Sequence, residues 1–341
     1  MTSISAFWIL PLLVLVACAA ATGGVLRWLT RAAVLDHPGP RSLHVAPTPR
    51  GGGLAVVAVL LPAWAAVAYL AGDPPAGPGL WPVLAGVLVL AAISWADDLK
   101  SLPPLWRLPV HGLAVTLGVW AATGDPVFQG ILPGWLDALA AGLLWLWFMN
   151  LFNFMDGIDG LAGVEAAAIG GGLAMVALLS GLNAGAALPI AGFGLTLAAA
   201  ALGFLLWNRP PAKIFLGDVG SIPLGFLAGF LLLETARAGA WAAALILPAY
   251  FLIDATWTLL ARLARGISPM EPHAEHFYQR AVRESGRSHG QVTLAVLVAD
   301  LALIALAVGA EREGERLVGL LGAVAVVALL IRRIMRPKAR Q

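Results

Sequence analysis

The most regular feature of this sequence is a succession of long apolar runs separated by short polar connections. A run of roughly 20 apolar residues can cross a bilayer as a helix, because each helical residue adds about 1.5 Å. Eleven runs reach or approach this length, at residues 7–28, 53–71, 80–96, 108–123, 135–152, 161–179, 187–206, 221–235, 240–261, 291–309 and 316–333. The pattern predicts an all-α polytopic membrane protein with about 11 transmembrane helices.

The basic residues are divided unevenly between the two sides of these runs. All of the 21 Lys and Arg residues except Arg237, Arg312 and Arg316 lie in or flank connections that follow odd-numbered runs, or the chain end after the last run. Cytoplasmic connections carry the excess of Lys and Arg in membrane proteins. We therefore expect the N-terminus outside and the C-terminus in the cytoplasm, with cytoplasmic loops at about 29–52, 97–107, 153–160, 207–220 and 262–290.

Composition agrees with a lipid environment. The chain is 60% hydrophobic and 12% charged, with a mean hydropathy of +0.86, whereas a soluble domain is about one quarter charged. We expect residues 1–341 to form one integral domain in the plasma (inner) membrane, with membrane lipid around it and no nucleic-acid partner. The single cysteine, Cys18, excludes disulfides and cysteine-based metal sites within one chain.

The first apolar run could be a retained helix or a cleaved leader. A secretory signal has a basic start and a shorter apolar core, and no Lys or Arg precedes this run. The segment 15–18 resembles a lipoprotein processing site, but it lacks the same basic start. We interpret the run as a retained transmembrane helix.

Five carboxylates stand at the predicted cytoplasmic ends of the runs: Asp97, Asp98, Asp156, Asp159 and Asp218. One such residue could be explained as a solvated helix end. Five are harder to explain in this way, because carboxylates near the membrane are costly and three separate loops place these at the same membrane depth. Clustered hard oxygen ligands suit Mg²⁺, which binds one or two carboxylates together with substrate phosphates. The acids therefore indicate a Mg²⁺ site that handles phosphates, with Mn²⁺ as an alternative ion.

Two further cytoplasmic segments combine turn residues with polar side chains. The segment 213–221 contains two glycines and opens a run, so its backbone N–H groups favour a phosphate. Lys213 adds positive charge there, and Phe215 offers a face for a base or for interfacial packing. Asn150 and Asn153 share one helix face, and their amides can read the donors and acceptors of a nucleobase or sugar.

The first and the longest inner loops carry basic residues and histidines. Arg41, His44 and Arg50 fit contact with a diphosphate or lipid phosphate, although a basic loop can also contact anionic lipid. His273 and His276 are spaced like metal ligands, but soft ligands are otherwise lacking. We therefore favour phosphate binding for both histidines.

Taken in order, these segments resemble the polyprenyl-phosphate N-acetylhexosamine-1-phosphate transferases (glycosyltransferase family 4), which include the peptidoglycan translocase and the initiators of O-antigen and teichoic acid. The resemblance runs from about residue 36 to 283. Five blocks carry it: Arg41-Ser-x-His44 with Pro-Arg50-Gly-Gly, Asp97-Asp98-Leu, Asn150-x-x-Asn153-x-x-Asp156-Gly-Ile-Asp159-Gly-Leu, Phe215-x-Gly-Asp218-x-Gly-Ser and the loop with His273 and His276.

The resemblance implies a role for each matching residue. Asp97 and Asp98 would deprotonate or position a lipid phosphate, and Asp98 and Asp218 would lie at the metal. Asp156, Asp159, Asn208 and Phe215 would hold the uridine part of the donor. Arg107, His273 and His276 would bind phosphate. The histidine loop departs from the peptidoglycan translocase and is closer to the O-antigen branch, so the donor sugar stays open.

We therefore expect an enzyme that transfers a sugar-1-phosphate from a UDP-N-acetyl sugar to undecaprenyl phosphate and releases UMP. Direct transfer and a route through an aspartyl-phosphate both remain open, as does a homodimer. The first alternative is a proton- or cation-coupled transporter that uses Glu165, Asp254 and His111. The second is a non-catalytic membrane scaffold.

Overall fold

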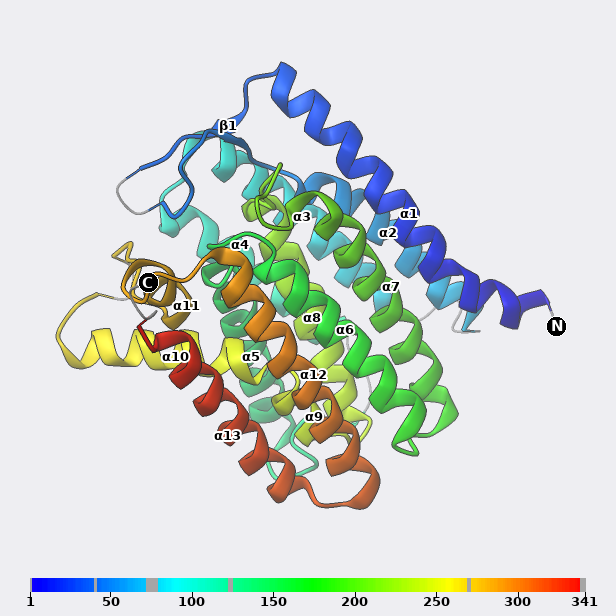
Figure 1. Cartoon of the computed structure of the whole chain (residues 1–341). Helices are drawn as coiled ribbons and strands as arrows, with labels where there is room; N and C mark the ends of the chain where they lie inside the picture. Colours follow the sequence, from blue (N-terminus) through cyan, green and yellow to red (C-terminus); the bar gives the residue numbers. More distant parts are fainter. Residues whose placement is uncertain (1, 40–41, 72–78, 122–124, 269–270, 338–341) are drawn as a thin grey trace.

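The computed structural model describes residues 2–39, 42–71, 79–121, 125–268 and 271–337, with side chains from Phe7 onward (Figure 1). Helices make up about 76% of the structure, which confirms the all-α expectation. They are α1 (Thr2–Arg31), α2 (Gly53–Leu70), α3 (Leu80–Lys100), α4 (Pro104–Ala121), α5 (Gly134–Phe154), α6 (Leu161–Leu179), α7 (Ala184–Asn208), α8 (Asp218–Arg237), α9 (Trp241–Ile246), α10 (Ala249–Ala264), α11 (Phe277–Arg283), α12 (His289–Glu313) and α13 (Arg316–Met335). Two short strands, β1 (Leu35–Asp36) and β2 (Thr48–Pro49), form an antiparallel pair.

Among the described residues, nine helices are long and apolar enough to cross a membrane. They are α1, α2, α3, α5, α6, α7, α8, α12 and α13. The chain is thus a polytopic α-helical membrane protein. The fourth predicted run falls on α4, which is not among the nine, so the count of eleven crossings stays a prediction.

The ninth predicted run, residues 240–261, is not one continuous helix, and here the sequence prediction was wrong. The run is divided into α9 and α10 at Leu247 and Pro248. A proline lacks the N–H that a continuing helix needs and its ring crowds the preceding turn. Figure 1 shows the consequence: α10 is turned away from the direction shared by α12 and α13.

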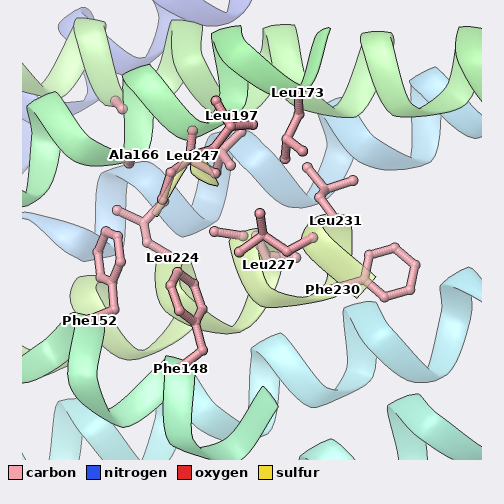
Figure 2. Packing of buried hydrophobic residues seen from close by; sticks show 14 of the residues in the cluster. Phe148, Phe152, Ala166, Leu173, Leu197, Leu224, Leu227, Phe230, Leu231 and Leu247 are labelled. Carbon is pink, nitrogen blue, oxygen red and sulfur yellow. The ribbon is translucent and has the colours of Figure 1, made fainter. Parts of the chain in front are cut away.

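Helix α8 lies at the centre of the bundle. Within its most apolar stretch 94% of the residues are buried, against 22% for α1 at the periphery. Figure 2 shows Leu227 and Phe230 of α8 among buried side chains that include Phe148 and Phe152 of α5. Lipid offers no hydrophobic driving force between helices, so this close packing is what stabilises the bundle.

Glycines allow the helices that carry the polar loops to approach closely. A Cβ placed on Gly53, at the start of α2, would lie 2.1 Å from the Cα of Gly220 in α8. The backbones therefore touch where both helices begin. This contact places the chain just before α2 against the chain just before α8.

The first inner loop is fixed to the segment before α8 by main-chain hydrogen bonds. Phe215 N–H donates to Pro49 O at 2.8 Å, and Gly52 N–H donates to Phe215 O at 2.9 Å. Gly51 lies between them with φ +116°, a conformation that favours glycine. Arg50 is thereby held beside the first turn of α8.

Candidate active site

A polar cavity of about 480 Å³ lies where the loops before α2, α6, α8 and α11 meet. It is lined by nine of the side chains that the sequence singled out: His44, Arg50, Arg107, Asp156, Asp159, Asn208, Phe215, His273 and His276. Segments far apart in the chain thus form one site. Arg41 lies outside the described residues. The other predicted residues do not line the cavity: Asp97, Asp98, Asn150, Asn153, Lys213 and Asp218.

Asp98 binds the start of α8. Its Oδ1 accepts the N–H of Asp218 at 3.0 Å, and its Oδ2 accepts the N–H of Val219 at 3.0 Å. The first N–H groups of a helix have no partner within the helix, so a carboxylate there caps it. Arg50 Nε lies 2.8 Å from Asp98 Oδ1, and the Asp98 side chain has no exposed surface.

Asp218 is held between two arginines. Its Oδ1 lies 3.0 Å from a terminal nitrogen of Arg50, and its Oδ2 lies 3.0 Å from a terminal nitrogen of Arg107. Arg107 also forms an ion pair with Asp97. Burial alone would lower the pKa of the Arg50 guanidinium, but Asp98 and Asp218 outweigh it and raise that pKa. Three carboxylates and two guanidinium groups thus form one charged cluster behind the cavity.

The two asparagines near the end of α5 have different surroundings. Asn153 donates to Asp218 Oδ1 at 3.1 Å and to Ser221 Oγ at 2.8 Å, so it belongs to the charged cluster. Asn150 donates to Leu146 O at 2.7 Å, and its oxygen lies 3.3 Å from His111 Nδ1.

The turn before α6 forms one wall of the cavity. Asn208 ties this turn to the segment after α7, because it accepts from Gly160 N–H at 2.9 Å and donates to Ile214 O at 2.8 Å. Burial raises the pKa of Asp156 well above its usual range, and the nearby Asp218 adds to the effect. Burial would also raise the pKa of Asp159, but hydrogen bonds from His289 and Ala212 N–H outweigh it and lower that pKa.

Phe215 contacts His44, whereas Lys213 packs on a tryptophan. The rings of Phe215 and His44 lie 5.0 Å apart with an edge-to-face geometry. His44 Nε2 is buried without a hydrogen-bond partner in the described part of the chain, although the residue lines the cavity. Lys213 lies over the ring of Trp207 at 5.7 Å.

The histidine loop closes the opposite wall. Glu275 forms ion pairs with Arg262 and with Arg265, the latter at 2.5 Å. The hydrogen bond from Arg265 lowers the pKa of Glu275. Burial, with His276 and Arg262 nearby, lowers the pKa of His273 to about 4. His273 is therefore a neutral ring near pH 7, and it can meet a phosphate only as an N–H donor.

Some cavity residues could not be found by sequence reasoning. His289, at the start of α12, lines the cavity and its Nδ1 lies 3.2 Å from Asp159 Oδ1. Asp36 in β1 and Gln279 in α11 also line it. Each is a single polar residue without a recognisable motif, so nothing in the one sequence indicated it.

The three residues of the transporter alternative have separate environments. His111 contacts Asn150, as described above. Asp254 accepts the N–H of Phe277 at 2.9 Å at the start of α11. Glu165 is fully buried, and neither of its carboxyl oxygens has a hydrogen-bond partner among the described residues. Asp300 of α12 is its electrostatic neighbour.

Comparison with known proteins gives consistent matches. The family described as Glycosyl transferase family 4 matches residues 80–236. A decaprenyl-phosphate N-acetylglucosaminephosphotransferase from Mycolicibacterium smegmatis is 33% identical over 323 residues, 81% of this chain and 75% of that protein. The protein of the same name from Mycobacterium leprae is 30% identical over 314 residues, with 81% and 76% covered. A phospho-N-acetylmuramoyl-pentapeptide-transferase from Synechococcus sp. is 35% identical over 219 residues, and that match spans 59% of this chain and 58% of the relative.

Proposed function

This chain belongs to the polyprenyl-phosphate N-acetylhexosamine-1-phosphate transferases of glycosyl transferase family 4, and from that premise we propose that it transfers a sugar-1-phosphate from a UDP-N-acetylhexosamine to undecaprenyl phosphate and releases UMP. The observation that carries the proposal is the position of Asp218 between Arg50 and Arg107, two arginines that line the cavity. Acids and guanidinium groups in one cluster match a reaction that joins two phosphate-bearing substrates.

The proposed reaction is a displacement at phosphorus. An oxygen of the lipid phosphate attacks the β-phosphorus of the UDP-sugar, and the bond from that phosphorus to the bridging oxygen breaks. UMP leaves with the bridging oxygen. Arg107 is suited to hold the incoming phosphate, because its Nε is buried without a partner among the described residues. Asp97 orients Arg107 through their ion pair and is suited to accept a proton from a protonated lipid phosphate.

The residues at the cluster fit a divalent cation such as Mg²⁺. Carboxylate oxygens are ligands that Mg²⁺ prefers, and Asp218 supplies two of them next to the cavity-lining Arg50 and Arg107. Among the described residues no group of three or more His, Cys, Asp or Glu side chains could hold a metal, which agrees with an ion that takes its other ligands from substrate phosphates and water. Asp218 would hold it, while Asp98 already binds the N–H groups of α8. When bound, the ion would neutralise charge on the diphosphate.

We place this chemistry at the cytoplasmic face of the plasma membrane. The cavity is formed by the connections that carry most of the Lys and Arg residues, which supports that orientation. Figure 1 shows α1 beginning and α13 ending at opposite ends of the bundle, as an odd number of crossings requires. The lipid acceptor has its phosphate at this interface, so the acceptor and the soluble donor can meet there.

The product would be the first lipid-linked sugar of a cell-envelope polysaccharide. The relatives are named for N-acetylglucosamine phosphate and for phospho-N-acetylmuramoyl-pentapeptide. The histidine loop of this chain favours an O-antigen, teichoic-acid or capsule type of polymer. The donor is therefore best identified with a panel of UDP-N-acetyl sugars.

The test measures UMP release by purified protein in detergent, with undecaprenyl phosphate and that panel, with and without Mg²⁺. We expect one donor to give metal-dependent UMP. Asp218→Asn should abolish it, whereas Glu234→Gln, at the other end of α8, should retain it. Folded wild-type protein that releases no UMP from any donor would exclude the proposed activity and favour the transporter or the scaffold.

A further inference from the structure

Asp254 of α10 is a buried carboxylate that organises the start of α11. Its Oδ1 accepts the N–H of Phe277 at 2.9 Å, and its Oδ2 accepts the N–H of Tyr278 at 3.2 Å. The residue has no exposed surface. A buried carboxylate is costly unless its oxygens are hydrogen-bonded, so this carboxylate and the first turn of α11 stabilise each other.

Two hydroxyl groups fix the orientation of the carboxylate. Tyr250 Oη donates to Asp254 Oδ2 at 3.2 Å, and Thr258 Oγ1 donates to Asp254 Oδ1 at 3.3 Å. Both residues lie on α10, one turn before and one turn after Asp254, on the same helix face. The carboxylate is thus held from its own helix and presented to α11.

His276, directly before α11, connects this carboxylate to the cavity. Its Nδ1 lies 3.3 Å from Asp254 Oδ1, an ion pair when the imidazole is protonated. The ring stacks on Phe154 at 6.5 Å and on Tyr278 at 5.9 Å. His276 nevertheless lines the cavity. Nδ1 is buried and makes no hydrogen bond among the described residues, so its link to Asp254 is electrostatic, and Nε2 is the ring nitrogen left for a ligand.

We propose that Asp254 is a positioning residue for substrate binding: by holding His276 and the first turn of α11 together, it presents Nε2 of His276 to a phosphate oxygen in the cavity. The proposal rests on the proposed function for the identity of the phosphate, which belongs either to the diphosphate of the donor or to the lipid acceptor. Asp254 itself contacts no substrate. Its effect passes through His276.

A double-mutant cycle separates this role from general stability. Asp254→Asn removes the charge, and His276→Gln removes the imidazole. Each single variant should raise the KM for one substrate about tenfold, the size expected for one lost charged hydrogen bond. The double variant should resemble His276→Gln alone, because Asp254 acts through that ring. If the two increases multiply instead, Asp254 does not act through His276.

The two KM values identify the source of the phosphate. An increase for the UDP-sugar alone assigns Nε2 to the diphosphate, and an increase for undecaprenyl phosphate alone assigns it to the lipid. Thr256→Val is the matched control, because Thr256 lies on the same helix but accepts a hydrogen bond from Trp147 at 3.2 Å and does not contact Asp254. It should leave both KM values unchanged.

A binding measurement makes the result independent of the transfer reaction. Inorganic diphosphate is titrated calorimetrically into wild-type protein and the same variants. We expect about tenfold weaker binding in Asp254→Asn and in His276→Gln, without a further loss in the double variant. Tyr250→Phe, which keeps the charge, replaces Asp254→Asn if that variant does not fold, and it should weaken binding less. Diphosphate binding that is absent, or unaffected by these substitutions, overturns the proposal when the KM for undecaprenyl phosphate is unchanged as well. Binding that follows the cycle in a protein without transferase activity would refute the proposed function alone.

Discussion

Asp98 and Asp218 are joined through the backbone: the carboxylate of Asp98 accepts the N–H of Asp218 at 3.0 Å, at the first residue of α8. The two acids therefore differ in what they can do. Asp98 has both oxygens engaged by α8 and no exposed side-chain surface. Asp218 directs its carboxylate toward Arg50 and Arg107, which line the cavity. Asp98 therefore positions Asp218.

This relationship predicts different consequences for two similar substitutions. Asp98→Asn leaves an N–H group of α8 without its charged acceptor and removes the ion pair with Arg50. It should lower the free energy of unfolding by about 1–3 kcal/mol and lower activity as well. Asp218→Asn should abolish activity with a much smaller change in melting temperature. Melting in detergent and UMP release measure both effects. Equal melting temperatures would contradict the helix-capping role of Asp98.

The sequence could predict which residues meet at the cavity but not how Asp97 and Asp98 divide their roles. Asp156 and Phe215 follow different apolar runs that end at the same membrane face, so their proximity follows from topology. Successive residues on a helix point about 100° apart. Asp97 therefore faces Arg107 while Asp98 faces α8, and this difference depends on how α3 packs.

The break between α9 and α10 shows a second limit of the sequence. Pro62 and Pro189 lie inside the continuous helices α2 and α7, whereas Pro248 separates two helices. Neighbouring helices can satisfy the backbone around a proline in a membrane, so the residue alone does not decide the outcome. A hydropathy scale gives the same value to all three prolines. Only the packing around each one distinguishes them.

Arg107 should not tolerate replacement by lysine. A terminal nitrogen of Arg107 contacts both Asp97 and Asp218, and its Nε is left for a ligand. A lysine ammonium is a point charge and cannot reproduce this planar arrangement of donors. Arg107→Lys should lower kcat/KM by about 10- to 100-fold, the loss of one charged hydrogen bond.

The control for that variant is Arg312→Lys, at the other end of the bundle from the cavity. It should leave kcat/KM unchanged. Steady-state UMP release measures both variants. Activity of Arg107→Lys within about twofold of wild type would show that only the charge of Arg107 matters.

Gly157 should be intolerant of any side chain. A Cβ at this position would lie 2.1 Å from the hydroxyl oxygen of Tyr278, which donates to Phe154 O at 2.9 Å. Gly157→Ala should therefore destabilise the protein by about 1–3 kcal/mol. Gly112→Ala is the control, because a Cβ on Gly112 meets no atom within 4 Å. Thermal melting compares the two, and Tyr278→Phe should restore part of the stability lost in Gly157→Ala.

The contact between His289 and Asp159 predicts a pH-dependent contribution to stability. Burial would raise the pKa of Asp159, but the hydrogen bond from His289 and that from Ala212 lower it. A carboxyl group with a lowered pKa in the folded state stabilises the protein above its unfolded pKa, about 3.9 for Asp, and loses this contribution as the pH falls through the folded value. His289→Gln removes one of the two hydrogen bonds, so the pKa of Asp159 should rise.

Melting temperatures of wild type and His289→Gln should therefore differ most near neutral pH. The difference should shrink below about pH 4, as Asp159 becomes protonated first in the unfolded state and then in the folded state. Gln291→Ala, two residues further along α12, is the control for the helix start, because Gln291 hydrogen-bonds Ser288 and does not contact Asp159. Its difference from wild type should not depend on pH in this range. A difference for His289→Gln that stays constant down to about pH 3 would show that the ring stabilises the loop by packing and not through the Asp159 carboxylate.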